Sequence, residues 1–166
     1  MMNELYYTYY QSPIGLLKIA GTEHYIAELS FIDKPEQMIH GEPGVSEVMH
    51  QCTEQLIEFF SGKRRVFDIP VHQPGTYFQL KVWGELLQIP FGKTLSYLEL
   101  SRNVGDEKAV RAVAATNGKN KIAIVIPCHR VIGSDKSLIG YGGGLWRKKW
   151  LLQHEFRIAN GIQTLF

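Results

Sequence analysis

Short runs of aromatic and β-branched residues, each with polar residues interspersed, fill the first 31 positions of the chain. The runs are Glu4–Gln11, Ile14–Ala20 and Tyr25–Phe31, and they are separated by Ser12-Pro13 and Gly21-Thr22. Runs of this composition are typical of strands, and the separating residues are typical of turns. The pattern predicts a small antiparallel sheet.

A helical period follows the strand pattern. Ser46 has the side chain of an N-cap, and apolar residues then recur three to four positions apart. These residues are Val48, Cys52, Leu56 and Phe59–Phe60. We expect this helix to end at Gly62 and a short strand to follow near Val66–Ile69.

The second half of the sequence is mostly helical in pattern. Thr76 and Gln79 have the spacing of a capping box, at the start of a helix with one apolar face. That face contains Phe78, Val82, Leu86 and Leu87. Because the structural type changes at Pro74-Gly75, we predict two domains, residues 1–74 and 75–166.

Two short helices joined by a glycine turn indicate a helix-turn-helix. Ser96 and Glu99 form a second capping box, Gly105 ends that helix, and Asp106 is expected to cap the next one, which runs to about Asn117-Gly118.

Arg111 is expected on one face of that second helix with Lys108, three residues before it. Small residues surround this face: Ala109, Ala112, Ala114 and Ala115. They would let the helix approach another surface closely, and tight packing against a neighbouring helix is an equally physical explanation.

A continuous apolar run, Lys121–Ile126, predicts a buried strand or extended segment that leads to Pro127-Cys128-His129. A glycine-rich loop, Gly140–Gly144, follows. The final helix is expected over Leu145–Arg157. We expect its inward side chains to be Trp146, Trp150 and Leu151, and its outward ones Arg147, Lys148 and Lys149.

Composition places the chain among globular proteins, with 45% hydrophobic and 20% charged residues. No apolar run approaches the roughly 20 residues that span a bilayer, and the N-terminus lacks the pattern of a secretion signal. Two cysteines do not make a disulfide framework. We therefore expect a cytoplasmic protein of the α+β class with reduced thiols.

The net charge of +2 hides an asymmetry between the two halves. Residues 1–74 contain 5 Lys and Arg against 10 Asp and Glu, whereas residues 75–166 contain 13 against 6. A basic half favours a polyanionic partner. Uneven charge on two solvated surfaces is the alternative.

Cys128, between Pro127 and His129, is a candidate nucleophile, because a histidine or cationic neighbour stabilises the reactive thiolate. A lone cysteine is more often a small buried hydrophobe, the role we expect for Cys52. His50-Gln51-Cys52 is too small a set for a tetrahedral metal site, so we predict no metal.

Several motifs occur in the order found in one known family. Ile126-Pro127-Cys128-His129-Arg130-Val131 resembles the active-site signature of the O6-alkylguanine-DNA alkyltransferases. Further matching segments are Tyr97, Arg111-Ala112-Val113, Asn120, Tyr141 with Gly143-Gly144, and Trp150–Glu155, with weaker support from Pro13–Leu17. The strong matches span roughly Thr76 to Glu155, about half of the chain.

The resemblance implies a fold and a reaction. The fold would be a ribonuclease H-like N-terminal domain with a structural role, followed by a winged-helix-like C-terminal domain. Cys128 would take an alkyl group from O6-alkylguanine, once and irreversibly, without a cofactor. His129, oriented by Glu155, would accept the thiol proton through a water. Tyr97, helped by Lys148, would donate toward guanine N3, and Asn120 would order the loop beside the cysteine.

The resemblance also implies how duplex DNA is bound. The helix carrying Arg111 would enter the minor groove, the alkylated nucleotide would flip out, and Arg111 would fill its place. The implied DNA contacts are Arg111, Tyr97, Lys108, Ala112, Ala115 and Ser134. The flipped base would be held by Tyr141, Gly143 and the Val131 backbone. The protein would act as a monomer, and O4-alkylthymine is a further possible substrate.

Three other functions remain alternatives at this point. A protein that binds alkylated bases without repairing them is the nearest, although such relatives lack the reactive cysteine. A helix-turn-helix transcription factor would leave Cys128, His129 and Glu155 unexplained. A thiol hydrolase with a Cys-His-Glu triad would turn over repeatedly.

Overall fold

Three antiparallel strands open the part of the chain that the computed structural model describes, which is residues 5–34 and 42–161. They are β1 (Tyr6–Ser12), β2 (Gly15–Gly21) and β3 (Ile26–Ile32), and β2 pairs with both neighbours. The predicted strands are confirmed, apart from Glu4, which lies outside the described residues.

The first hairpin turn is held by one side chain. The Ser12 hydroxyl accepts the Ile14 N–H at 3.2 Å and donates to the Gly15 carbonyl at 2.6 Å. Gly15 has a φ of +123°, a conformation that favours glycine. The turn therefore sets the register from Ser12↔Gly15 to Tyr6↔Gly21.

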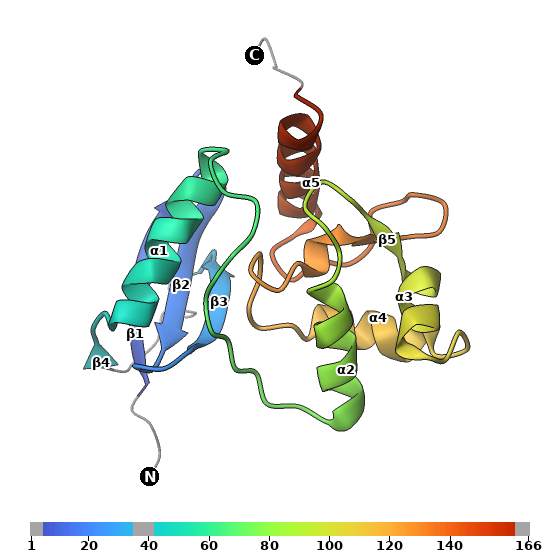
Figure 1. The fold of residues 1–166 in the computed structure, drawn as a ribbon, viewed down its shortest axis with the longest axis horizontal. Helices are drawn as coiled ribbons and strands as arrows, with labels where there is room; N and C mark the ends of the chain where they lie inside the picture. Colours follow the sequence, from blue (N-terminus) through green and yellow to red (C-terminus); the bar gives the residue numbers. More distant parts are fainter. Residues whose placement is uncertain (1–4, 35–41, 162–166) are drawn as a thin grey trace. The chain divides into compact units, whose positions relative to one another are not determined.

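The helix α1 (Glu47–Phe60) packs against this sheet, as Figure 1 shows. The predicted N-cap is confirmed, because Ser46 Oγ accepts the Met49 N–H at 3.3 Å. One face of α1 is fully buried, with Met49, Cys52, Leu56 and Phe59 each at 0% exposure. Cys52 is thus a core residue, and burial raises the pKa of its thiol to about 12.

The short strand expected near Val66–Ile69 is wrong. The Asp68 N–H and carbonyl instead bond the Gln55 side chain, at 2.9 and 3.1 Å, and Val66 is 74% exposed. Sheet pairing in this region is a single parallel bridge between Ile26 and Val71. A two-residue strand that the pattern did not predict, β4 (Glu42–Pro43), pairs with β1.

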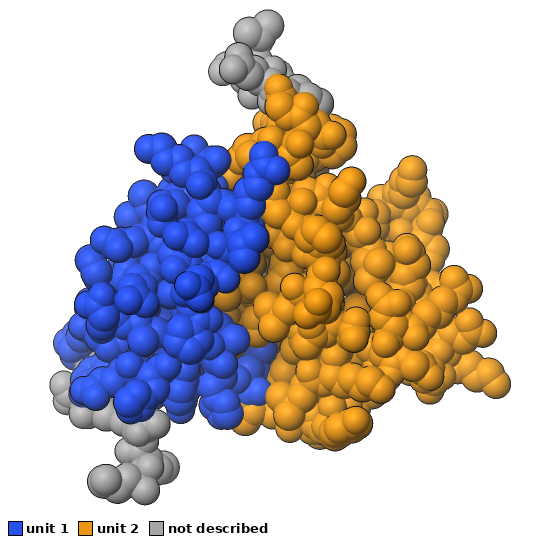
Figure 2. Space-filling model, viewed as in Figure 1, with its two compact units in different colours: residues 1–73 blue, residues 74–166 orange. Residues whose placement is uncertain are grey.

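The chain divides into two compact units, residues 1–73 and 74–166, which Figure 2 colours separately. The second unit begins with α2 (Tyr77–Leu86), whose capping box is present as predicted: Thr76 Oγ1 accepts the Gln79 N–H, and Gln79 Oε1 accepts the Thr76 N–H. Trp83 on α2 donates its indole N–H to the Thr116 carbonyl at 3.0 Å.

The helix-turn-helix consists of α3 (Tyr97–Val104) and α4 (Val110–Gly118). The Ser96–Glu99 capping box opens α3, and Gly105 ends it with a φ of +103°, both as predicted. Asp106, however, does not cap α4.

The Asp106 side chain accepts the Lys108 N–H at 2.9 Å, and its carbonyl accepts the Ala109 N–H at 3.0 Å. These two bonds close a turn, so α4 begins only at Val110. Lys108 therefore lies in the turn and not on the helical face with Arg111, which corrects the predicted i, i+3 placement.

Residues 121–126 are mostly buried but do not form a strand, which corrects that expectation. Their backbone makes tight turns, with Val125 N–H bonding Ala123 O at 2.7 Å and Ile126 N–H bonding Ile122 O at 3.1 Å. Ile124 has a φ of +71°, which is unusual for a β-branched residue. The turns lead directly into the 3-10 helix η2 (Cys128–Arg130).

A short parallel pair, β5 (Leu95–Ser96) with β6 (Val131–Ile132), joins η2 to the helix-turn-helix. Because β5 directly precedes Tyr97 and β6 directly follows η2, this pair brings Tyr97 to the region of Cys128. The winged-helix detail stays a prediction.

The last helix, α5 (Leu145–Ala159), differs from prediction in the side chains that it buries. Arg147 and Lys148 are 2% and 0% exposed, whereas Trp146 is 57% exposed. Arg147, Lys148, Leu151 and Glu155 share the buried face at helical spacing. The two cations can be buried because backbone carbonyls accept their hydrogens, as described below.

Candidate active site

Cys128 begins η2 and is 6% exposed. Its backbone is held on both sides: its N–H bonds Ile126 O at 2.8 Å, and its carbonyl accepts the Val131 N–H and, at 3.3 Å, Asn117 Nδ2. The turn that carries the thiol is therefore fixed to the inner face of α4.

Asn120 organises the turns before the cysteine. Its Nδ2 donates to Ile126 O at 2.9 Å and to Ile122 O at 3.3 Å, while its Oδ1 accepts the Ile122 N–H at 3.1 Å. Burial raises the pKa of the Cys128 thiol, and a hydrogen bond from Asn120 and the charge of Lys148 lower it in part. Asn120 thus acts on both the loop and the thiol.

Glu155 accepts four hydrogen bonds in a fully buried position. His129 Nε2 lies 2.6 Å from Oε2, Arg130 donates from Nε at 2.8 Å and from Nη2 at 3.0 Å, and the Gly92 N–H donates at 3.3 Å. Burial by itself would raise the pKa of Glu155, but the charges and hydrogen bonds of His129 and Arg130 outweigh it and lower the pKa to about 2. Glu155 is therefore a carboxylate at neutral pH.

A carboxylate only accepts hydrogen bonds, so Nε2 of His129 carries the hydrogen in this pair. In the neutral ring, Nδ1 then presents a lone pair. Nδ1 is buried and has no hydrogen-bond partner among the described residues. His129 is thus arranged as a base oriented by a carboxylate.

Arg130 belongs to this centre, although the sequence pattern assigned it no role. Besides Glu155, its guanidinium bonds Ile89 O at 2.7 Å and lies 5.8 Å from the Phe91 ring centroid. The cue in the sequence was a cation inside an apolar segment, because such a residue must find an anion when it is buried.

Tyr97 and Lys148 converge on one carbonyl. The Tyr97 hydroxyl donates to Ile139 O at 3.0 Å, and Lys148 Nζ donates to the same oxygen at 2.8 Å and to Gly140 O at 3.3 Å. Burial lowers the pKa of Lys148 to about 8, against the smaller raising effect of Cys128. The predicted pair is therefore brought together at the start of the glycine loop.

Tyr141 places its hydroxyl in a buried position without a hydrogen-bond partner among the described residues. Burial raises the pKa of Tyr141 well above its usual value, and the charge of Cys128 raises it further. Arg147, a second residue without an assigned role, donates to Gly143 O at 3.0 Å and so fixes the loop. Val131 is fully buried beside Cys128.

Five of the six residues predicted to contact DNA are on the surface, and the sixth, Tyr97, is buried at 8% exposure. Arg111, Ala112 and Ala115 are exposed on α4, while Val113 and Asn117 point inward. Lys108 is exposed in the turn before α4, and Ser134 is exposed in the turn after β6. The structure thus puts the small residues and Arg111 on one outward face.

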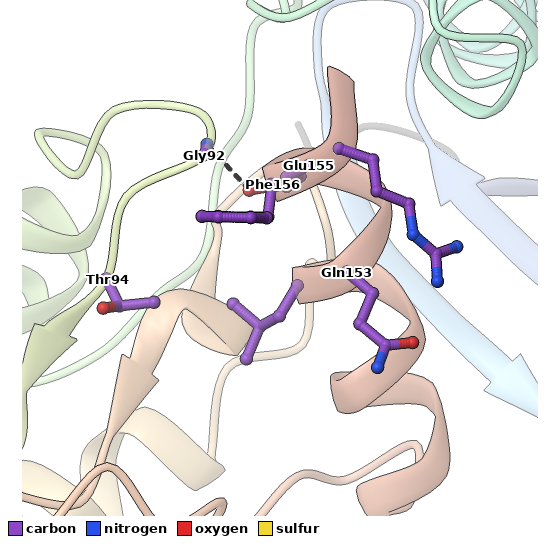
Figure 3. A pocket seen from close by; sticks show the side chains of 7 residues that line it. Gly92, Thr94, Gln153, Glu155 and Phe156 are labelled. Carbon is purple, nitrogen blue, oxygen red and sulfur yellow. Dashed lines mark hydrogen bonds between the residues drawn. The ribbon is translucent and has the colours of Figure 1, made fainter. Parts of the chain in front are cut away.

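Glu155 also borders a cavity of about 430 Å³ between the turn at residues 92–94 and α5. Figure 3 shows the Phe156 side chain in this space, near Thr94 and Gly92. Cys128 and Tyr141 are not among its lining residues, so it is distinct from the surroundings of the thiol.

Within residues 5–34 and 42–161, no three His, Cys, Asp or Glu side chains gather as metal ligands would. None of the helices in these ranges is both long and apolar enough to cross a bilayer.

Comparison with known proteins identifies relatives over nearly the whole chain. Residues 77–157 match the family model of the 6-O-methylguanine DNA methyltransferase DNA binding domain, and residues 5–73 match that of its ribonuclease-like domain. A methylated-DNA–protein-cysteine methyltransferase of Mycolicibacterium paratuberculosis is 44% identical, over 93% of this chain and 94% of its own. One from Methanosarcina acetivorans is 39% identical, over 91% and 98%.

A solved structure of a related protein is similar to this chain in both fold and sequence. Mycobacterium tuberculosis OGT in complex with DNA has a TM-score of 0.85 and 40% identity, over 92% of this chain and 94% of its own. The family models together match both units of the chain. This chain therefore belongs to the 6-O-methylguanine DNA methyltransferase family.

Proposed function

We propose that this protein repairs alkylated DNA directly, by moving the alkyl group of O6-alkylguanine in duplex DNA to Sγ of Cys128, once per molecule. The observation that carries the proposal is the buried pair of His129 and Glu155, whose side chains are 2.6 Å apart. His129 lies in the same 3-10 turn as Cys128, and Glu155 lies on α5. A cysteine used only for packing, such as the buried Cys52, needs no such oriented base.

The first step makes the nucleophile. His129 Nδ1 accepts the thiol proton of Cys128 through a water, and Glu155 stabilises the resulting imidazolium. Lys148 stabilises the thiolate by its charge, and Asn120 does so by its hydrogen bond. These contributions offset part of the effect of burial, which favours the neutral thiol.

The second step is a displacement at an sp³ carbon. The thiolate forms the S–C bond while the C–O6 bond breaks, and the electron pair leaves with guanine. Tyr97 donates a hydrogen bond toward N3 of the departing base, with Lys148 beside it, which makes guanine a better leaving group. Guanine takes up a proton in place of the one that Cys128 released.

The helix α4 binds the DNA. Arg111 and the exposed Ala112 and Ala115 give α4 a narrow outward face that fits the minor groove. The alkylated nucleotide flips out at a cost of a few kcal/mol, and Arg111 takes its place in the stack. Lys108 and Ser134 contact the phosphates, in the basic half of the chain.

The flipped base lies between Tyr141 and Gly143 on one side and the Val131 backbone on the other. The Tyr141 hydroxyl has no hydrogen-bond partner within residues 5–34 and 42–161 and is available to a ligand in this place. Residues 75–166 thus act as the DNA-binding alkyltransferase domain, and residues 1–74 have a structural role.

The product is a thioether, which water does not hydrolyse, so each monomer reacts once without a cofactor. A reducing compartment such as the cytoplasm keeps the Cys128 thiol available.

Intact-mass spectrometry with an excess of duplex containing one O6-methylguanine tests the function. We expect a gain of one methylene mass, stopping at one equivalent, and no gain in Cys128→Ala. Cys52→Ala is the matched control. It should still gain the methylene, because the fully buried Cys52 of the unmodified protein does not accept the alkyl group. Lesion-selective binding without a mass gain would indicate a non-catalytic binding protein, and repeated turnover would indicate a thiol hydrolase.

Arg111→Ala is expected to slow transfer from the duplex by about tenfold or more, because the flipped state loses the side chain that replaces the base in the stack. The rate at which iodoacetamide alkylates Cys128, a reaction that needs no DNA, should stay within about twofold of the rate in the unmodified protein. Lys63→Ala, an equal loss of charge on an exposed residue of the first unit, is the control. An equal slowing in both variants would exclude a specific role for Arg111.

A further inference from the structure

Trp146, in the first turn of α5, is a large side chain that the proposed function does not use. It is 57% exposed, although the next residue, Arg147, is only 2% exposed. The two side chains are in contact, because Arg147 Cζ lies over the indole ring, 4.6 Å from its centroid. An exposed indole thus covers a buried guanidinium.

The guanidinium of Arg147 is stabilised by two groups. Burying a cation is costly unless neighbouring groups compensate for the water that it loses. Arg147 Nη1 donates to Gly143 O at 3.0 Å, and the electron-rich face of the Trp146 ring attracts the positive charge. The carbonyl and the ring together keep the guanidinium in one position.

The indole also lies close to the backbone of the loop that Arg147 holds. Gly144 is the N-cap of α5 and has a φ of +93°. A Cβ on Gly144 would lie 3.3 Å from Trp146 Cδ1 and 3.5 Å from Nε1. The ring therefore fills the space beside Gly144, directly after the residue whose carbonyl Arg147 holds.

The loop depends on α5 for its conformation. Residues 142–144 are all glycine, which has more backbone freedom than any other residue and offers no side chain to hold the loop. Two consecutive cations of α5 hold the loop at its ends instead. Lys148 Nζ donates to Ile139 O at 2.8 Å, and Arg147 donates to Gly143 O.

We propose that Trp146 is a positioning residue for this loop: it keeps Arg147 on the Gly143 carbonyl and so holds the loop against the flipped base. This inference rests on the proposed function, in which Tyr141 and Gly143 hold that base. Removal of the ring would let water compete for the guanidinium and loosen the loop. A smaller fraction of the bound DNA would then have its flipped base held in the site.

Single-turnover methyl transfer tests this inference, at saturating concentrations of a duplex that contains one O6-methylguanine. Trp146→Ala is expected to lower this rate about fivefold, the effect of a cation–π contact at a partly desolvated site. Trp146→Phe keeps an aromatic face over the guanidinium and should stay within about twofold of the unmodified protein. If Trp146→Phe is as slow as Trp146→Ala, or if neither is slowed, the inference is wrong.

Tyr77→Ala is the matched control, because it removes another exposed aromatic side chain, 83% exposed on α2. Its rate of transfer should stay within about twofold of the rate in the unmodified protein. An equal slowing in Tyr77→Ala and Trp146→Ala would show that loss of any exposed aromatic residue has this effect, and would refute the role of Trp146.

A double-mutant cycle isolates the contact with Arg147. In an Arg147→Met background, Trp146→Ala should slow transfer less than about twofold further, because no guanidinium remains to be held. Equal slowing in both backgrounds would overturn the inference. If Arg147→Met does not fold, the comparison of Trp146→Ala with Trp146→Phe decides the question.

Two further measurements distinguish the loop from the DNA surface and from the thiol. Affinity for unmethylated duplex, and the rate at which iodoacetamide alkylates Cys128, should each change less than about twofold in Trp146→Ala. A fivefold fall in that affinity would assign Trp146 to DNA contact, and a fivefold fall in alkylation would assign it to the surroundings of Cys128. Either result would refute the inference, whereas absence of methyl transfer in the unmodified protein would refute the proposed function itself.

Discussion

Glu155→Gln is expected to lower the free energy of unfolding at pH 7 by about 3 kcal/mol, because it leaves the buried Arg130 guanidinium without its anion. Breaking a buried ion pair from one side costs on the order of 3–5 kcal/mol. The fall in the pKa of Glu155 from 4.5 to about 2 gives a similar figure, roughly 3 kcal/mol. Urea unfolding at pH 7 measures this difference.

Glu155→Gln should also make the free energy of unfolding less dependent on pH in the acid range. Because folding lowers the pKa of Glu155, its contribution is complete above the unfolded value near 4.5 and is lost as the pH falls toward 2. The difference in free energy of unfolding between Glu155→Gln and the unmodified protein should therefore become smaller below about pH 4.5.

Glu58→Gln is the matched control for the Glu155 variant. Its ion pair with Arg64 is partly exposed, with 3.3 Å between Nε and Oε1, so its loss should cost less than about 1 kcal/mol. If Glu155→Gln lowers the free energy of unfolding by an equally small amount, or by the same amount from pH 7 to pH 3, the structural account of Glu155 is contradicted.

Gly92→Ala is expected to destabilise the protein by about 2–4 kcal/mol. A Cβ on Gly92 would lie 2.5 Å from the Ala159 Cβ on α5, and the φ of +79° disfavours any side chain. Overpacking costs about 1–3 kcal/mol, and a left-handed conformation adds roughly 1 kcal/mol. The turn would have to move away from α5 and lose the Gly92 N–H bond to Glu155, the dashed line in Figure 3.

Gly84→Ala tests whether glycine loss alone has this effect. Gly84 lies inside α2, and a Cβ there would meet nothing within 4 Å. Alanine favours helix by about 0.5–1 kcal/mol over glycine, so this variant should be slightly more stable. A Gly92→Ala protein whose urea midpoint equals that of the parent would show that the turn is not held tightly on α5.

Local signals predicted the fold well. The three strands, the Ser46 cap and both capping boxes depend on residues within a few positions of each other, and each is present. The failures came where conformation depended on a distant or unexpected partner. Residues 122–126 are apolar and largely buried, but Asn120 bonds their backbone into turns, and apolar character alone does not distinguish a turn from a strand.

The sequence predicted which residues form the site better than it predicted how their side chains contact one another. The resemblance to the alkyltransferase family pointed to His129 and Glu155, and these two residues do meet. Arg130 and Asn117 were missed because their partners lie 25 and 11 positions away. Lys148 was expected on the outside of α5, since a cation is usually exposed, and the loop carbonyls that accept its hydrogens could not be foreseen.

The sequence by itself determined the three long strands, the N-caps of α1, α2 and α3, the reactive motif and the family, because these depend on short spacings and on residue identity. Tertiary structure decided which groups share a proton or a charge. The donors to Glu155 come from positions up to 63 residues away, and hydrogen bonds require placement within a few tenths of an ångström. Only the packing of α5 against the turn at Gly92 and against η2 provides that placement, and with it a carboxylate that orients His129.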